Sequence, residues 1–202
     1  MGSNQETLTV YQEYFDEYVD GTPQVTESPY KEWIDELLAR VDTQTPILEI
    51  GSAFGRDADY IKNAGYANIT PTDAFDAAVA SLKQRGFVNA HKLNLLTDDI
   101  EGRYGLVIAI AVFLHFTETE FVSVLRKLQG PLSEKGILGF TVKQGDGEEW
   151  SEHKMGAPRF FHYWQMEPLR RSVEDCGYAV LDIRNTDESQ KWLAVTCQPK
   201  EL

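Results

Sequence analysis

The stretch Ile47-Leu48-Glu49-Ile50-Gly51-Ser52-Ala53-Phe54-Gly55-Arg56 decides how the rest of this sequence is interpreted. A short, mostly apolar run is followed by a turn with two glycines and then by an amphipathic segment. A glycine turn between a buried strand and a helix lets a ligand approach the backbone, where the first N–H groups of the helix are free. The stretch therefore predicts a strand, a ligand-binding turn and a helix.

An alternation of short apolar runs and amphipathic segments surrounds this stretch, as in repeated βα units. We predict parallel strands at 46–50, 68–72, 88–93, 104–111 and 136–142. Helices are expected at 56–64 and 76–85, and a third follows Thr117, which forms a capping box with Glu120. The run 104–111 is the most apolar, as suits a central strand buried on both faces.

The C-terminal part predicts a helix at 169–176, opened by Pro168, and two further strands at 179–185 and 192–197. Only a short polar turn, 186–190, separates these strands, so they should pair antiparallel. The whole pattern is α/β, with a seven-stranded mixed sheet whose last strand is antiparallel.

Two amphipathic helices precede the first strand, with apolar stripes that begin at Leu8 and at Tyr30. We expect a single domain over 1–202, because domains commonly span ~100–200 residues. Residues 1–44 would form N-terminal cap helices and residues 45–202 the core. Residues 1–3 (Met-Gly-Ser) are set aside as a sequence without bearing on the fold.

The charge balance limits the partners. Nineteen Lys and Arg residues stand against 32 Asp and Glu, which gives a net charge of −13. Such a chain is repelled by phosphate backbones and anionic lipid, so neither nucleic acid nor a membrane surface is expected as a partner. The longest apolar run, 106–114, is far shorter than the ~20 residues of a membrane span.

The two cysteines, Cys176 and Cys197, are too few for a disulfide framework. No secretory signal is visible, so a cytoplasmic location is expected. The four histidines are scattered and no Cys/His/Asp group has ligand spacing, so no metal is expected.

Two common phosphate-binding motifs do not fit the glycine turn. The dinucleotide fingerprint G-x-G-x-x-G/A needs a small residue where Arg56 stands, so a nicotinamide enzyme is the weakest alternative. A phosphate loop needs Gly-Lys-Ser/Thr, which does not follow.

The remaining pattern, Glu49-x-Gly51-x-Ala53-x-Gly55, resembles the glycine motif E/D-x-G-x-G-x-G of class I S-adenosylmethionine-dependent methyltransferases of the bacterial small-molecule type. Asp73 follows 22 residues after Gly51, where the family places an acid that accepts hydrogen bonds from both ribose hydroxyls. The resemblance covers most of the chain. Ala53 replaces the middle glycine of the family, which is tolerable if the φ angle of Ala53 is negative.

This resemblance implies a Rossmann-like three-layer sandwich with N-terminal cap helices. It also implies an enzyme that uses S-adenosyl-L-methionine, releases S-adenosyl-L-homocysteine and moves a methyl group to a small-molecule acceptor by in-line displacement. The alternatives are a protein methyltransferase acting on a basic peptide and a non-catalytic S-adenosylmethionine-binding module. The oligomeric state stays open.

The resemblance further implies which residues would bind the cofactor. The methionine end would meet Glu49 and the glycine turn, the ribose Asp73, and the adenine the residues around Phe75 and Asn94. The full set is Glu49, Gly51, Ser52, Ala53, Gly55, Arg56, Asp73, Ala74, Phe75, Asn94, Leu95, Ala109, Ile110 and Ala111. Core packing is the alternative for Phe75 and Leu95, a helix N-cap for Asp73, and simple exposure for Arg56.

Methyl transfer needs a general base only if the acceptor must lose a proton, so no catalytic triad is required. His115 and His162 are weak candidates for such a base, and a structural role for His115 is the alternative. The long segment 143–166 is a possible substrate lid, because long structured loops are usually functional. Its alternative is an edge hairpin that packs aromatic side chains on the sheet. The expected substrate contacts are Tyr14, Tyr18, Lys143, Trp150, Arg159, His162 and Tyr163.

Overall fold

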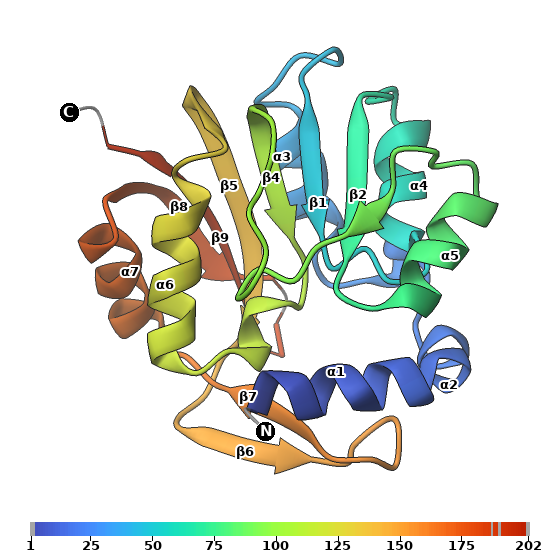
Figure 1. Cartoon of the computed structure of the whole chain (residues 1–202). Helices are drawn as coiled ribbons and strands as arrows, with labels where there is room; N and C mark the ends of the chain where they lie inside the picture. The colour runs from blue at the N-terminus through green and yellow to red at the C-terminus, as the bar shows by residue number, and fades with distance from the viewer. Residues whose placement is uncertain (1–2, 187, 190, 201–202) are drawn as a thin grey trace.

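A seven-stranded sheet forms the centre of the computed structural model, which describes residues 3–186, 188–189 and 191–200 (Figure 1). The strand order is β3-β2-β1-β4-β5-β9-β8. Its strands are β1 (Ile47–Ile50), β2 (Ile69–Asp73), β3 (His91–Lys92), β4 (Tyr104–Ala109), β5 (Leu132–Lys143), β8 (Tyr178–Asn185) and β9 (Trp192–Pro199). Residues 187 and 190 of the expected turn 186–190, and residues 1–2 of the set-aside N-terminus, lie outside the described residues.

The pairing confirms the predicted mixed sheet. Strands β1 to β5 run parallel, whereas β9 lies antiparallel between β5 and β8. In the centre, Ile50 of β1 is in register with Thr72 of β2 on one side and Ala109 of β4 on the other. The carboxyl ends of β1, β2 and β4 therefore meet at one edge, where ligands bind in open α/β sheets.

Helices cover both faces of the sheet, which gives the predicted three layers. The core on one face contains Leu48 and Val107 and is closed by α6 (Glu118–Leu128) and α7 (Met166–Asp175). The core on the other face contains Ile47 and Ile108 and is closed by α3 (Lys31–Leu38), α4 (Arg56–Asn63) and α5 (Asp76–Gln84).

The helix α3 belongs to this second layer and does not lie over the strand ends as a cap. Its Leu37 side chain leaves so little room over β5 that a Cβ on Gly139 would lie 2.4 Å from it. Its Trp33 Nε1 donates a hydrogen bond of 3.0 Å to Thr196 Oγ1 in β9. Burial of the apolar stripe of α3 against the sheet explains this position, because Ile34 and Leu37 are buried in one core with Ile108 of β4.

Several element boundaries differ from the sequence prediction, most clearly at β3, where only His91–Lys92 of the expected 88–93 forms a strand. The helix α7 begins at Met166, ahead of Pro168, because a proline in the first turn needs no N–H partner there. The strand β5 begins at Leu132, four residues early, and Tyr104 N donates to Pro131 O beside it. The capping box of Thr117 and Glu120 at α6 is confirmed.

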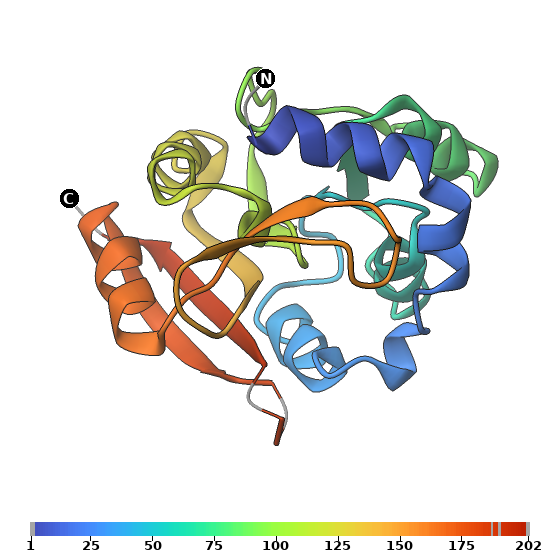
Figure 2. The same cartoon turned by 90° about the horizontal axis from the view of Figure 1, so that it is seen from below.

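Two segments far apart in the sequence lie together across the carboxyl ends of the strands (Figures 1 and 2). One consists of α1 (Ser3–Glu13) and α2 (Phe15–Asp20). The other is a hairpin of β6 (Glu148–Ser151) and β7 (Arg159–His162), which forms a two-stranded sheet of its own. Thr7 Oγ1 of α1 accepts a hydrogen bond of 3.0 Å from Phe160 N of β7.

The segment 143–166 is thus a hairpin that adds no strand to the main sheet, and Trp164 packs into the core against Phe121. In the described part of the chain, no helix is long and apolar enough to cross a membrane.

Candidate ligand-binding site

The glycine turn after β1 has a backbone shape that only its small residues permit. Gly51 and Gly55 have φ angles of 72° and 87°, in the left-handed region that favours glycine. A Cβ on Gly51 would lie 2.3 Å from Cγ2 of Val112, closer than any real contact. A Cβ on Gly55 would lie 2.9 Å from Leu82. The turn therefore exposes bare backbone at the edge of the sheet, as the sequence motif predicts.

Ala53 corrects one expectation. Its φ angle is +47°, so the condition of a negative φ was wrong. An alanine in the left-handed region costs roughly 1–2 kcal/mol relative to ordinary conformations. The hydrogen bond of 2.7 Å from Ala53 N to Asp73 Oδ2 holds the residue in this conformation. Ala111, after β4 on the same edge, is strained similarly at φ 57°, and its N donates to Thr141 Oγ1.

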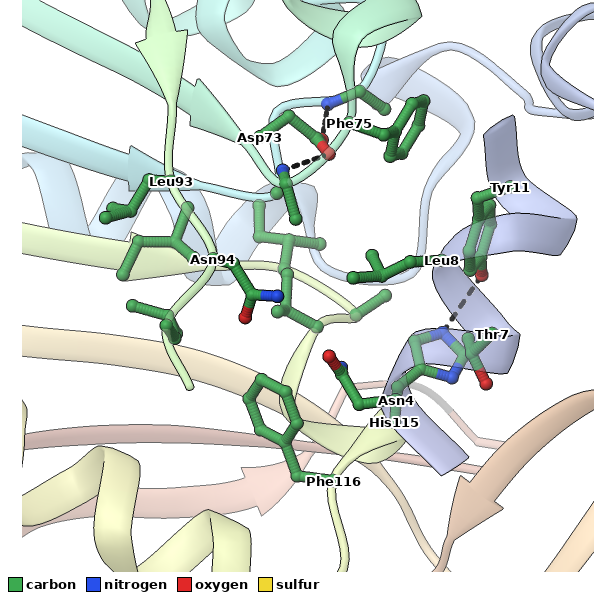
Figure 3. A pocket seen from close by; sticks show the side chains of 18 of the residues that line it. Asn4, Thr7, Leu8, Tyr11, Asp73, Phe75, Leu93, Asn94, His115 and Phe116 are labelled. Carbon is green, nitrogen blue, oxygen red and sulfur yellow. Dashed lines mark hydrogen bonds between the residues drawn. The ribbon is translucent and has the colours of Figure 1, made fainter. Parts of the chain in front are cut away.

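Asp73 is the buried acid of the site, with 5% of its surface exposed. Its two carboxylate oxygens accept hydrogen bonds of 2.7 Å from Ala53 N and Ala74 N (Figure 3). Burial raises the pKa of Asp73 to about 6, and these backbone hydrogen bonds oppose the rise. The helix α5 has Phe75 as its N-cap residue and no side-chain cap, so Asp73 is not the N-cap. The carboxylate is therefore a fixed, ionised acceptor at neutral pH.

A first cavity of about 90 Å³ lies beside this carboxylate. Its walls are largely apolar side chains that follow β2, β3 and β4 and that come from α1 (Figure 3). It is lined by Asn4, Thr7, Leu8, Tyr11, Tyr18, Ile50, Gly51, Ala53, Asp73, Ala74, Phe75, Leu93, Asn94, Leu95, Ile110, Ala111, Val112, His115 and Phe116.

Three side chains, those of Phe75, Tyr11 and Asn94, define the walls of this cavity. The ring of Phe75 lies parallel to that of Tyr11, with ring centroids 6.4 Å apart. Asn94 Oδ1 accepts a hydrogen bond of 3.0 Å from Leu96 N, which leaves the amide nitrogen toward the cavity (Figure 3). The cavity thus offers a flat apolar space with an amide donor on one wall and a carboxylate on another.

Sequence reasoning missed the contribution of the first helix turns. Asn4, Thr7, Leu8 and Tyr11 recur at helical spacing, so one face of α1 closes the cavity. The stripe was predicted only from Leu8 onward, because Asn4 and Thr7 are polar and do not extend an apolar pattern. The helical spacing of these four residues was the sequence signal that could have predicted this face of α1.

Two other predicted cofactor residues take unexpected places. Glu49 is buried beneath the turn, where it accepts a hydrogen bond of 2.7 Å from Ser52 Oγ. Burial raises the pKa of Glu49 to about 8, so the group is mostly protonated at neutral pH. Arg56 pairs with Asp57 at 2.9 Å and donates to Pro23 O at 2.9 Å. Glu49, Gly55 and Ala109 line neither cavity.

A second cavity of about 550 Å³ adjoins the first and shares Tyr11, Tyr18 and His115 with it. It lies among the glycine turn, the end of β5 and the β6–β7 hairpin. Its lining is Tyr11, Tyr18, Thr22, Pro23, Tyr30, Gly51, Ser52, Ala53, Phe54, Arg56, Asp57, Ile110, Ala111, Leu114, His115, Lys143, Glu149, Ser151, His153, Lys154, Arg159, Phe161, Lys191 and Trp192.

A chain of hydrogen bonds separates the two cavities. Arg159 Nη1 donates to Tyr11 Oη at 2.9 Å, and Tyr11 Oη lies 2.9 Å from His115 Nε2 (Figure 3). His115 Nδ1 lies 2.7 Å from the carbonyl of Phe160, so Nδ1 donates and Nε2 accepts from Tyr11. Burial lowers the pKa of His115 to about 3, which keeps the imidazole neutral. His115 thus ties α1 to β7.

The predicted substrate residues divide into two groups. Tyr18, Lys143 and Arg159 line the second cavity, whereas Tyr14, Trp150, His162 and Tyr163 line neither. His162 Nδ1 instead lies 3.0 Å from Glu148, and Trp150 is 46% exposed. Within the hairpin, strand alternation explains why Arg159 faces the cavity and Trp150 and His162 do not, because neighbouring residues of a strand point to opposite faces. In the described ranges, no group of three or more His, Cys, Asp or Glu side chains is arranged to hold a metal ion.

Comparisons with known proteins show the class of fold. No protein-family model matches the sequence, and no curated protein does. A 1,6-didemethyltoxoflavin-N1-methyltransferase of Burkholderia thailandensis, solved with S-adenosylhomocysteine, is 18% identical at a TM-score of 0.76, covering 100% of this chain and 92% of its own. The CcbJ methyltransferase of Streptomyces caelestis is 14% identical at a TM-score of 0.76, and the match covers 95% of this chain and 98% of that protein. The protein in the DhpI–S-adenosylhomocysteine complex is 15% identical at a TM-score of 0.75, and the match covers 98% of this chain and 97% of that protein. This chain therefore has the α/β fold of S-adenosylmethionine-dependent methyltransferases.

Proposed function

We propose that this protein is an S-adenosylmethionine-dependent methyltransferase that methylates a small-molecule acceptor. The observation that carries the proposal is the position of Asp73, an ionised acceptor at the end of β2, beside bare backbone at Gly51. A carboxylate at this strand end is suited to the two hydroxyls of a ribose. The neighbours of the same fold that carry S-adenosylhomocysteine support this assignment.

The residues present fit this cofactor. Asp73 would hold the ribose, and Phe75, Leu93 and Leu95 supply the apolar walls that an adenine needs. The free amide of Asn94 would donate to an adenine ring nitrogen. The backbone around Gly51, Ser52 and Ala53 would meet the methionine end, because these three residues line the second cavity where it adjoins the first. When bound, the cofactor supplies an activated methyl group on a sulfonium.

The second cavity is the place for the acceptor. It adjoins the first at Ile110, Ala111 and His115, so an acceptor there lies next to the methionine end of the cofactor site. Catalysis then consists of positioning the acceptor and excluding water. His115 is a poor general base in this arrangement, because burial lowers the pKa of its imidazole to about 3 and its Nε2 already accepts a hydrogen bond from Tyr11. The site therefore suits an acceptor that attacks without losing a proton to the protein.

The covering segments act as a lid in this proposal. Helices α1 and α2 and the hairpin within 143–166 close both cavities from the solvent side, and the bond of Thr7 to Phe160 joins them. Because that bond ties the two segments, α1 and the hairpin would move together when a ligand enters. Of the remaining predicted residues, Trp150, His162 and Tyr163 would support the hairpin, where Trp150 packs against Phe160 and His162 lies beside Glu148. Tyr14 lies between α1 and α2 and has no part in it.

We also propose a cytoplasmic location and no nucleic-acid partner. Cys176 and Cys197 are both buried free thiols, as suits a reducing compartment. The net charge of −13 opposes broad contact with phosphate backbones.

The proposal is tested by calorimetric titration with S-adenosylhomocysteine of the wild-type protein and of Asp73→Asn. We expect micromolar binding to the wild type and a loss of about tenfold or more in the variant, because a buried charged acceptor is replaced by an amide. Asp76→Asn is the matched control, since its carboxylate is 81% exposed and pairs only with Lys92. Wild-type protein that folds but binds no S-adenosylhomocysteine contradicts the proposal, as does equal binding by both variants.

A further inference from the structure

The second cavity reverses the charge balance of the chain. The whole sequence has 19 basic and 32 acidic side chains, yet this cavity is lined by five basic side chains and two acidic ones. The basic residues are Arg56, Lys143, Lys154, Arg159 and Lys191, and the acidic residues are Asp57 and Glu149. Asp57 pairs with Arg56, and Glu149 accepts a hydrogen bond from Tyr163.

Arg159 is the most buried of these cations, at 4% exposed. Its guanidinium donates to Tyr11 Oη and to the carbonyl of His153, which are both neutral groups. Among the residues that the structure describes, its Nε is a buried donor without an acceptor, and no carboxylate forms an ion pair with it. A buried cation is costly unless it is paired, so this arrangement lacks a negative charge.

Two lysines of this cavity, Lys143 (partly buried) and Lys154 (exposed), also form no ion pair with a carboxylate among the described residues. Lys143 Nζ lies 4.3 Å from the ring centroid of Phe161, whose ring also lies 5.2 Å from the guanidinium of Arg159. Lys154 Nζ lies 4.3 Å from the ring centroid of Tyr18 and donates to Thr22 Oγ1. Burial and the charge of Arg159 lower the pKa of both lysines, that of Lys154 to about 8. Aromatic rings and a hydroxyl are weaker partners than a carboxylate.

From these contacts we infer that the methyl acceptor carries an oxyanion, a carboxylate or a phosphonate or phosphate group, which Arg159, Lys143 and Lys154 bind together. This inference rests on the proposed function, because it names the substrate class of the same site. An oxyanion supplies the missing acceptors and relieves the mutual repulsion of the three cations. A basic peptide is disfavoured for the same reason.

The carboxylate of the cofactor itself is the competing occupant for these cations. It would lie near the glycine turn, whereas Lys143, Lys154 and Arg159 come from β5 and the β6–β7 hairpin. The test must therefore measure cofactor binding and anion binding in the same variants.

The experiment titrates the protein, free and saturated with S-adenosylhomocysteine, with four probes of similar size at constant ionic strength. These are phenylphosphonate, benzoate, the neutral benzamide and the cationic benzylamine. We expect the two anions to bind about tenfold or more tightly than benzamide, and benzylamine to bind more weakly still. The ratio of phenylphosphonate to benzoate affinity tells which anion the cluster prefers.

Two variants and a matched control locate the anion. Lys154→Met and Arg159→Met should each weaken benzoate and phenylphosphonate binding about tenfold, and Lys154→Met should change S-adenosylhomocysteine affinity less than twofold. Lys62→Met is the control, because Lys62 also lies over an aromatic ring, that of Phe87, but outside both cavities. Lys154 lies exposed in the turn between β6 and β7, so its variant reports on binding even if Arg159→Met does not fold.

Benzamide binding as tight as the anions overturns the inference and leaves the proposed function standing. Equal loss of anion and S-adenosylhomocysteine affinity in Lys154→Met also overturns it, because the cations would then serve the cofactor. Anion binding without any S-adenosylhomocysteine binding rejects the methyltransferase proposal and keeps the anion site.

Discussion

The two adjoining cavities are built in opposite ways. The first consists largely of backbone and apolar side chains that follow β1, β2, β3 and β4, with a single carboxylate, Asp73. The second takes its charged side chains mainly from α4, the end of β5 and the hairpin, and these are mostly cations. One cavity is shaped by a turn that tolerates few side chains, and the other by side chains brought together across long sequence separations.

This contrast shows which part of the site depends on local sequence. A glycine turn and a spaced acid specify a binding surface because the strand register places them side by side. Charged residues on a hairpin do not define a binding surface until tertiary packing fixes the position of the hairpin. Perturbations of the first cavity should therefore affect the cofactor and the fold together, whereas perturbations of the second should affect only the acceptor.

The largest expected effect is that of Gly51→Ala. The new Cβ would lie 2.3 Å from Val112, at a φ angle of 72°. We expect S-adenosylhomocysteine affinity to fall about 100-fold and the free energy of unfolding to fall by roughly 2–4 kcal/mol, measured by calorimetry and urea denaturation.

Gly65→Ala is the control for backbone strain alone, since its φ angle is 101° but no atom lies within 4 Å of the new Cβ. It should lower the free energy of unfolding by roughly 1–2 kcal/mol and leave cofactor affinity unchanged. Normal affinity in Gly51→Ala would show that bare backbone is not what the cavity requires.

An intermediate effect is expected from pH, because ligand affinity should rise with pH at the first cavity and fall with pH at the second. The pKa of Asp73 is raised to about 6, so S-adenosylhomocysteine should bind roughly tenfold more weakly at about pH 5 than at pH 7, as the acceptor is protonated. The pKa of Lys154 is lowered to about 8, so benzoate should bind more weakly at about pH 9 than at pH 7, as the cation is lost.

Titrations at these pH values measure both slopes. Asp73→Asn should remove the first slope without the second, and Lys154→Met should remove the second without the first. A single slope shared by both ligands would mean that the two cavities act as one site.

The smallest effect is that of Ala53→Gly. Glycine adopts a φ angle of +47° without strain, so we expect the free energy of unfolding to rise by about 0.5–1 kcal/mol. Ala58→Gly in α4 is the matched control and should lower that free energy by about 1 kcal/mol or more, because Ala58 is helical and buried. Urea denaturation of both variants measures the contrast, and a loss of stability at both positions would contradict the strain at Ala53.

The sequence predicted every strand of the main sheet and the side of the sheet where the site lies. Apolar periodicity, the glycine turn and the capping box are local signals, and local physics is enough to read them. The condition of a negative φ angle at Ala53 is not met, because Ala53 N donates the hydrogen bond that holds this residue to Asp73, twenty residues away.

By itself the sequence determined the order of helices and strands, the turn after β1 and the acid after β2, since each depends on neighbours along the chain. Only the tertiary structure decided that α3 packs on the sheet while α1 closes the first cavity, and which hairpin residues face inward. It also decided that Arg159, Tyr11 and His115 meet. Those contacts join residues up to 148 positions apart, and they depend on how the layers pack rather than on any pattern of neighbours.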